Sequence, residues 1–346
     1  ESATTSDDGL TWTFKIRPHT WSDGVPVTAG DFVFALRRLV DPKNSAAGAA
    51  LIYPFRNARK VNKGELAVEA LGVTAVDART LKIELEHPAP FLPELLTSYG
   101  TFPVPEHIVA KQKNWTRPGT MVSNGPYVLA AWRPHDHIKL RKNPRFFDAA
   151  NVKIDEVLFY PIDDELAALK RYRAGELDVQ ARWPTSEHAW LVKNAPRETL
   201  RVAELRTAFL SFNMTRAPFD DIRVRRAISL ASDETALARD VHRGLIGEAA
   251  RSFLPGATAG VEHDVEAPWA TLSMGERKAE ARRLLSAAGF DARHPLKLTY
   301  QYLAGADHKR AAVALLGTWK DAGIQAELLA REASTHWNTL EAHDFD

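Results

Sequence analysis

The chain has 346 residues, which is too long for a single small core and predicts two or three domains. Its 45 basic and 44 acidic residues leave a net charge of +1, so the composition gives no sign of a nucleic-acid partner. The absence of cysteine excludes disulfides, thiolate metal sites and cysteine nucleophiles. No run of 18 apolar residues occurs, so no membrane-spanning helix is predicted.

The first part of the chain alternates strand and helix patterns. Residues 12–16 place apolar side chains at every second position, which predicts a half-buried strand. Thr28, with Asp31 three residues later, predicts a capped helix that ends before Pro42. A second alternating run at 81–85 predicts another strand.

The middle of the chain predicts a hairpin and then a crossover unit. Residues 128–140 alternate around a polar turn, as a hairpin does. The apolar run 157–162 predicts a strand that is buried on both faces. A helix at 166–172, ended by Gly175, and a strand at 177–179 would complete a unit with parallel strands.

A second α/β pattern lies near the end of the sequence. Residues 296–302 and 324–328 alternate as strands, and residues 312–319 between them place apolar side chains on one helix face. This part therefore predicts an α/β domain of its own. Between the two α/β patterns we predict two helices and a long loop, at residues 224–231, 281–288 and 254–269 respectively.

The sequence lacks the common motifs of catalysis and metal binding. The sequence contains no nucleophile elbow, Walker A loop, dinucleotide-binding glycine motif or zinc-protease motif. The histidines of 135–137 could chelate a metal, but solvated side chains at a hairpin tip explain them more simply. The acidic pairs 163–164 and 220–221 precede helices, so they are interpreted as caps. The sequence therefore predicts no metal and no cofactor.

Several motifs, in their order and spacing, resemble family 5 of the bacterial extracellular solute-binding proteins, the oligopeptide- and dipeptide-binding group. Trp21-Ser22-Asp23-Gly24 is similar to part of the family's entry signature, and Gly175-Glu176-Leu177-Asp178 is similar to a later landmark. Each motif is weak alone, whereas the ordered set is specific. The remaining motifs occupy residues 12–17, 25–33, 124–127, 143–147, 212–213 and 218–228.

The resemblance implies an α/β fold of the periplasmic-binding-protein type: two α/β lobes with a hinge, plus an extra α+β domain. Residues 1–107 would form the extra domain, 108–208 the first lobe and 209–346 the second lobe. Residues 209–213 would contribute to the hinge strands. We expect all three parts to be incomplete and the sequence to be cut at both ends, with the acid and arginine that anchor peptide termini beyond Asp346.

The resemblance also implies a function. An extended oligopeptide would pair with strand-like main chain in the cleft between the lobes, with water-filled pockets for its side chains. Hinge closure would then present the complex to the membrane permease of an ABC importer. The protein would be a monomer, would use no cofactor, would bind no nucleic acid and would not be an enzyme. It would act in the periplasm after removal of a signal peptide, or from a lipid anchor in a Gram-positive bacterium.

The family resemblance points to ligand-binding residues in three places. They are Arg182 and Trp183; Ser211, Phe212 and Asn213; and His308 with Lys309. The first pair would supply a charge for an acidic group and an apolar pocket wall. Each place has a structural alternative that the sequence leaves open: a core tryptophan beside a surface arginine, a structural hinge, and a solvated helix start.

Other functions remain open on the sequence alone. The same fold could bind a cell-wall (murein) peptide, a nickel chelate, haem or an oligosaccharide. A secreted hydrolase would need a nucleophile near a base, for which the sequence offers no candidate. A scaffold or chaperone-like protein would fill its cleft with its own residues. The stretch 44–49 lacks an aromatic residue that the family often carries there, which could favour bulkier ligands.

Overall fold

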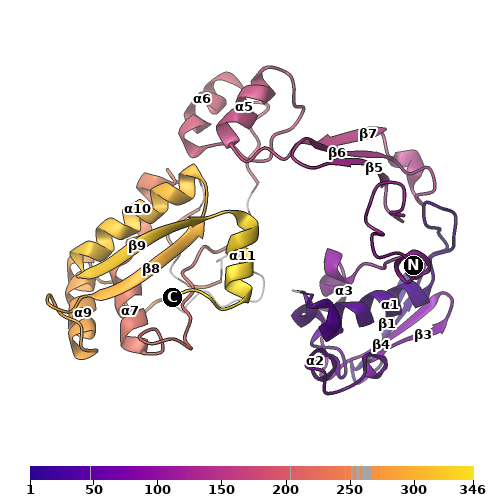
Figure 1. Ribbon diagram of the computed structural model, residues 1–346, viewed down its shortest axis with the longest axis horizontal. Helices are drawn as coiled ribbons and strands as arrows, with labels where there is room; N and C mark the ends of the chain where they lie inside the picture. The colour runs from indigo at the N-terminus through magenta and orange to yellow at the C-terminus, as the bar shows by residue number, and fades with distance from the viewer. Residues whose placement is uncertain (47, 203, 246, 251, 255–257, 259–265) are drawn as a thin grey trace. The chain divides into compact units, whose positions relative to one another are not determined.

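The computed structural model describes residues 1–46, 48–202, 204–245, 247–250, 252–254, 258 and 266–346 (Figure 1). The chain divides into two compact units, Glu1–Pro161 and Ile162–Asp346. The three domains expected from the family resemblance, with boundaries near 107 and 208, stay a prediction. Most of the predicted loop at 254–269 lies outside the described residues.

The first unit combines two antiparallel sheets with short helices. Its elements are β1 (Ser2–Thr5), β2 (Thr11–Lys15), α1 (Ala29–Val40), α2 (Ala58–Asn62), β3 (Val73–Asp77), β4 (Thr80–Glu84), α3 (Leu92–Leu95), α4 (Glu106–Val109), β5 (Tyr127–Arg133), β6 (His137–Lys142) and β7 (Glu156–Phe159), with 3₁₀ turns between them. One sheet has the order β1-β2-β4-β3 and the other the order β5-β6-β7.

Helix α1 and the four-stranded sheet share the core of the first unit. The backbone N–H of Thr28 donates to the carboxylate of Asp31 at 2.8 Å, so the predicted cap is confirmed. Leu36 on the helix and Ile83 on β4 are both fully buried in this core. The predicted strands at 12–16 and 81–85 are confirmed as β2 and β4, which pair antiparallel and contribute side chains to this core.

Strand β7 corrects the prediction of a strand buried on both faces at 157–162. Its register pairs Leu140 with Val157 in an antiparallel ladder with β6, which is its single neighbour among the described residues. Leu158 and Phe159 are 45% and 55% exposed. The parallel arrangement expected for this run was therefore wrong. An apolar run shows that its side chains are hydrophobic, but it does not specify which elements will cover them.

The second unit is an α/β body preceded by a helical segment. Its elements are α5 (Glu165–Arg173), η6 (Thr185–Glu187), α6 (His188–Asn194), α7 (Ile222–Ala231), α8 (Glu234–Ala236), η7 (Leu237–Val241), α9 (Met274–Ala287), β8 (Leu296–Leu303), α10 (Ala306–Asp321), β9 (Ile324–Arg331) and α11 (Ala333–Glu341). Strands β8 and β9 pair in parallel, from Leu296 opposite Ile324 to Leu303 opposite Arg331.

The late βαβ unit is confirmed, and helices α7, α9 and α10 gather around its two strands (Figure 1). Trp319 of α10 is buried in their common core, and its indole N–H donates to Ser232 at 2.9 Å. The core takes residues from 210 onward, and none of its described members comes from 162–208. The segment 162–208 therefore lies beside the α/β body without sharing its apolar core.

Two predicted strands of the second unit are absent. Residues 177–179 and 209–213 form no strand in the structure. Val179 and Phe209 are 81% and 63% exposed. A strand needs a neighbour for its backbone groups, and no strand of the described residues pairs with either segment. The early crossover unit with parallel strands was therefore wrong.

Candidate functional site

The start of α10 lies at the carboxyl end of the parallel strand β8. Gly305, the residue before the helix, has a φ of 154°, a backbone conformation that would be strained in a residue with a side chain. No side chain caps the helix, so the first-turn N–H groups face outward without a side-chain partner among the described residues. In open α/β sheets, ligands bind outside the carboxyl ends of the strands, so this edge is a candidate ligand site.

A threonine of the preceding segment reaches this helix start. The backbone N–H and the hydroxyl of Thr185 both donate to the carboxylate of Asp307, each at 3.4 Å. Arg310, one turn along α10, donates to the Thr185 hydroxyl at 2.9 Å and also pairs with Asp307. Thr185 is buried although it is polar. These bonds therefore join 162–208 to the α/β body through polar groups.

Further charges converge on Asp307. Burial raises the pKa of Glu165, and the nearby carboxylate of Asp307 raises it further. The charges of Arg182, His308 and Arg310 act on Glu165 in the opposite direction. Two of the predicted ligand-binding residues, Arg182 and His308, are thus brought together at this site.

Two additional histidines border the site. Burial lowers the pKa of His242, whose charge is also opposed by His308 and Arg310 and favoured by Asp307. Its Nδ1 atom is buried and has no hydrogen-bond partner among the described residues. Burial and the charge of His308 lower the pKa of His336 on α11. We call Glu165, Arg182, Thr185, His242, Asp307, His308 and Arg310 the Asp307 cluster.

Trp183 lies next to the cluster and is half-buried. Its indole ring stacks on the ring of His188 at the start of α6, with centroids 6.3 Å apart and planes 7° apart. The partly exposed face of Trp183 fits the apolar wall that was predicted for it, and the stack fixes its orientation. The ligand role itself stays a prediction.

Lys309 and the predicted hinge residues have other surroundings. The side chains of Lys309 and Ser211 are exposed. Phe212 stacks on Phe219 at 6.2 Å and packs against the core of the α/β body. Asn213 is buried, and its amide group donates to the carbonyls of residues 343 and 345 at 2.8 and 3.3 Å. These contacts favour the structural alternative for Phe212 and Asn213, and their ligand roles stay predictions.

Sequence reasoning missed five residues of the site, which are Glu165, Thr185, His242, Asp307 and Arg310. Glu165 follows Asp164, which was interpreted correctly as a cap because its carboxylate accepts from two N–H groups of the first turn. The position of Asp307 beside His308 was the one available signal. Its partner Thr185 is 122 residues away, so no local pattern could join them.

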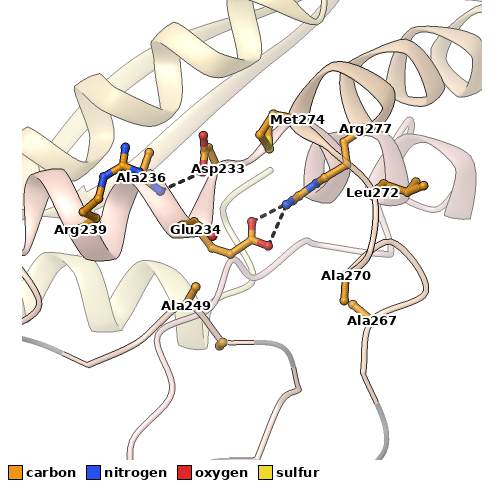
Figure 2. A pocket seen from close by; sticks show the side chains of 12 residues that line it. Asp233, Glu234, Ala236, Arg239, Ala249, Ala267, Ala270, Leu272, Met274 and Arg277 are labelled. Atoms are coloured by element: carbon orange, nitrogen blue, oxygen red, sulfur yellow. Dashed lines mark hydrogen bonds and ion pairs between the residues drawn. The ribbon is translucent and has the colours of Figure 1, made fainter.

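A separate pocket of about 310 Å³ lies where α8 and α9 begin (Figure 2). Inside it, the guanidinium of Arg277 faces the carboxylate of Glu234, with Nη1 and Nη2 each 2.8 Å from a carboxylate oxygen. The same guanidinium donates to the carbonyls of Ser229, Leu230 and Ser232. Because these donors are already occupied, the arrangement is that of a structural ion pair.

The first unit also carries an open groove of about 690 Å³ along α1, lined by Arg37, Arg38 and Glu69 among others. None of the predicted ligand residues lies in either of these hollows. Within the ranges that the structure describes, no group of three or more histidine, aspartate or glutamate side chains could hold a metal ion. The Asp307 cluster is therefore the candidate ligand site.

Comparison with known proteins identifies the family of this chain. The model of the family described as bacterial extracellular solute-binding proteins, family 5 (middle) matches residues 1–346. The chain belongs to family 5 of the bacterial extracellular solute-binding proteins. The family resemblance drawn from the motifs is thereby confirmed.

Several curated relatives of this family 5 protein carry names of peptide-binding proteins, whereas one, 36% identical, is named as a probable deoxycholate-binding periplasmic protein of Escherichia coli. The periplasmic murein peptide-binding protein MppA of Escherichia coli is 36% identical over 345 residues, covering 99% of this chain and 64% of its own length. The periplasmic oligopeptide-binding protein OppA of Salmonella typhimurium is 35% identical over 98% of this chain and 63% of its own length. The chain thus spans slightly less than two thirds of these relatives.

Solved structures confirm the fold of this family 5 protein. The murein tripeptide-binding protein MppA of Escherichia coli matches with a TM-score of 0.94 and 36% identity, over 100% of this chain and 68% of that one. OppA of Haemophilus influenzae, in complex with the peptide RPPGFSPFR, matches with a TM-score of 0.88 and 30% identity, over 100% and 69%. Among the described residues, no helix is both long and apolar enough to cross a membrane.

Proposed function

We propose that this chain is the main part of a periplasmic receptor that captures oligopeptides and delivers them to an ABC importer. Its membership of family 5 and the peptide-binding names of several relatives support the proposal. The relatives are described as binding proteins. We propose that this protein likewise only binds its ligand and catalyses no reaction. Its partners would be a peptide and a membrane permease, and it would act as a monomer.

The observation that carries the proposal is the polar junction at Thr185. This residue joins 162–208 to the α/β body through hydrogen bonds to Asp307 and Arg310. Since no described residue of 162–208 enters the apolar core of that body, separating the two would expose little apolar surface there. Such a junction suits two parts that open and close around a ligand.

The groups around the junction suit a peptide chemically. The uncapped start of α10 offers N–H groups, and Arg182, His308 and Lys309 offer cationic side chains, all of which favour a carboxylate. The half-buried ring of Trp183 offers an apolar surface. A peptide presents these complementary groups along an extended backbone, which can also pair with main-chain atoms.

A murein peptide is the second candidate ligand. Its support is the similarity to MppA of Escherichia coli, which is named as a murein peptide-binding protein and matches at 36% identity. A murein peptide has more carboxyl groups than an ordinary peptide of the same length, so the cationic residues of the Asp307 cluster would serve it as well.

Native mass spectrometry of the full-length gene product tests both candidates. We expect a ladder of masses that corresponds to co-purified peptides of several compositions. A single mass equal to a murein tripeptide would favour the second candidate. A metal or haem adduct with no peptide, or protein that stays free when incubated with a peptide mixture, would contradict the proposal.

A further inference from the structure

Glu165 is an acidic residue of the Asp307 cluster whose carboxylate has no hydrogen-bond or ion-pair partner among the described residues. It is the first residue of α5, but Asp164 already caps that helix by accepting from the N–H groups of Leu166 and Ala167 at 2.8 and 3.0 Å. The backbone carbonyl of Glu165 accepts from Gln180, whereas no described residue donates to its carboxylate or pairs with it. The carboxylate is therefore free for another partner.

The charges nearby are committed elsewhere or remain hydrated. Arg310 is engaged with Asp307 and Thr185. Arg182 and His308 are exposed, so water solvates them, and they act on Glu165 only through space. Glu165 itself is partly buried beside the like charge of Asp307, and both effects raise its pKa.

A partly buried carboxylate without a hydrogen-bond donor is costly, and a cation that reaches it removes that cost. An anion at exposed Arg182 gains less, because it replaces water around a well-hydrated group. The cluster thus favours a cation at Glu165 more strongly than an anion at Arg182.

We propose that Glu165 selects peptides that place a cationic side chain, lysine or arginine, at the Asp307 cluster. This inference rests on the proposed function, since it concerns the specificity of the same site. The ammonium or guanidinium group would donate to the Glu165 carboxylate and lie close to that of Asp307. Trp183 would flank the aliphatic stem of the ligand side chain.

A peptide series tests the inference in the full-length gene product. Each peptide is tetra-alanine with one residue replaced by lysine or by norleucine, which has a stem of the same length without the charge. We expect the lysine peptide to bind about tenfold more tightly than its norleucine counterpart at one position, the gain typical of a hydrogen bond to a charged group. Isothermal titration calorimetry measures the two dissociation constants.

The variant Glu165→Gln should abolish this preference, so that its dissociation constants for the lysine peptide and the norleucine peptide lie within about twofold of each other, a difference too small for a hydrogen bond. Asp163→Asn is the matched control, because Asp163 is an exposed carboxylate two residues away, and it should keep the full preference. Circular dichroism melting curves should be alike for all three proteins, since neither side chain is bonded within the described residues.

The possible failures are distinguishable. Equal binding of lysine and norleucine peptides at every position would overturn the role of Glu165 and leave the peptide receptor intact. A lysine preference that survives in Glu165→Gln would do the same. If none of the peptides binds, and none co-purifies, both this inference and the proposed function are wrong.

Discussion

The backbone N–H and the hydroxyl of Thr185 both donate to the carboxylate of Asp307, which lies 122 residues further along the chain. Thr185 follows a loop of the helical segment, whereas Asp307 is in the first turn of α10. Arg310 completes the junction by donating to the same hydroxyl. A few polar groups thus link two stretches of chain that have no common apolar core among the described residues.

Replacing Thr185 by valine should weaken peptide binding. Valine keeps the shape of threonine but removes the hydroxyl, and with it one bond to Asp307 and one from Arg310. If the junction forms when the protein closes on its ligand, the loss of about 1 kcal/mol raises the dissociation constant about fivefold. Stopped-flow fluorescence should show that the change lies mainly in a faster dissociation rate.

Thr199→Val is the matched control for that experiment. Its hydroxyl donates to the carbonyl of Ala195 at 2.9 Å, within the same segment, and has no hydrogen bond to the described residues of the α/β body. Its affinity for peptide should equal that of the unaltered protein. A dissociation constant that is unchanged in Thr185→Val, or raised equally in both variants, would show that the junction has no part in holding the ligand.

Asn213→Ala should separate a structural role from a ligand role. The buried amide of Asn213 donates to two carbonyls near residue 345, and its oxygen accepts from the N–H and hydroxyl of Thr215. Removing it leaves these groups unsatisfied, which should destabilise the second unit by about 2 kcal/mol. Urea unfolding measures the loss of stability. At a temperature at which the variant remains folded, its affinity for peptide should equal that of the unaltered protein.

Ser211→Ala provides the comparison, because Ser211 is exposed and two residues away. It should unfold at the same urea concentration as the unaltered protein. The opposite pattern, in which Asn213→Ala keeps its stability but binds peptide poorly, would restore the ligand role that the family resemblance implied for Asn213.

The elements that could be predicted are those whose causes are close in sequence. Asp164 and Asp221 cap α5 and α7, as their position before apolar-periodic runs indicated. The β8–α10–β9 unit was predicted because both strands and their connecting helix lie within 36 residues of one another. Local hydrogen bonds and apolar periodicity are sufficient to specify such units.

The failures have a different cause. Residues 177–179 alternate as a strand does, yet alternation reports which side chains prefer burial and not which strand supplies the hydrogen-bond partner. The cluster at Asp307 was half predicted for a similar reason. Arg182 and His308 were named from the family resemblance. Thr185 is bonded to Asp307 across 122 residues, and the carboxylate of Asp307 acts on Glu165 through its charge alone, and no local pattern contains either relationship.

Arg277→Met should destabilise the second unit strongly. Arg277 is 5% exposed and donates to both oxygens of Glu234 and to three backbone carbonyls. Methionine fills much of the volume but removes the donors that Arg277 provides to Glu234 and to the three carbonyls, which should cost about 3 kcal/mol. Chemical denaturation measures the free energy of unfolding.

Arg239→Met is the matched control, because it makes the same substitution at an exposed ion pair that lines the same pocket. Arg239 pairs with the adjacent Asp240, and both side chains are more than half exposed. Its loss should leave the free energy of unfolding unchanged within error, because solvent screens such pairs. Equal destabilisation by the two substitutions would mean that burial of the Arg277 ion pair is not what matters.

His242 should make the second unit less stable as the pH falls below neutrality. Burial holds the pKa of its imidazole in the folded protein below the ordinary value of 6.5, and the charges of His308 and Arg310 act in the same direction, against that of Asp307. The unfolded chain therefore takes up a proton at a higher pH than the folded one. The stability that neutral His242 contributes is present above about pH 6.5, is lost as the pH falls below it, and stops changing below the folded pKa. His336, whose pKa is lowered by burial and by His308, contributes in the same sense.

Melting temperatures measured between about pH 7 and about pH 5 should thus fall less steeply in His242→Phe than in the unaltered protein, and less steeply still in the double variant with His336→Phe. His294→Gln, which alters a side chain that is 82% exposed, should reproduce the original slope. A slope that is the same in all four proteins would show that neither histidine titrates differently on folding.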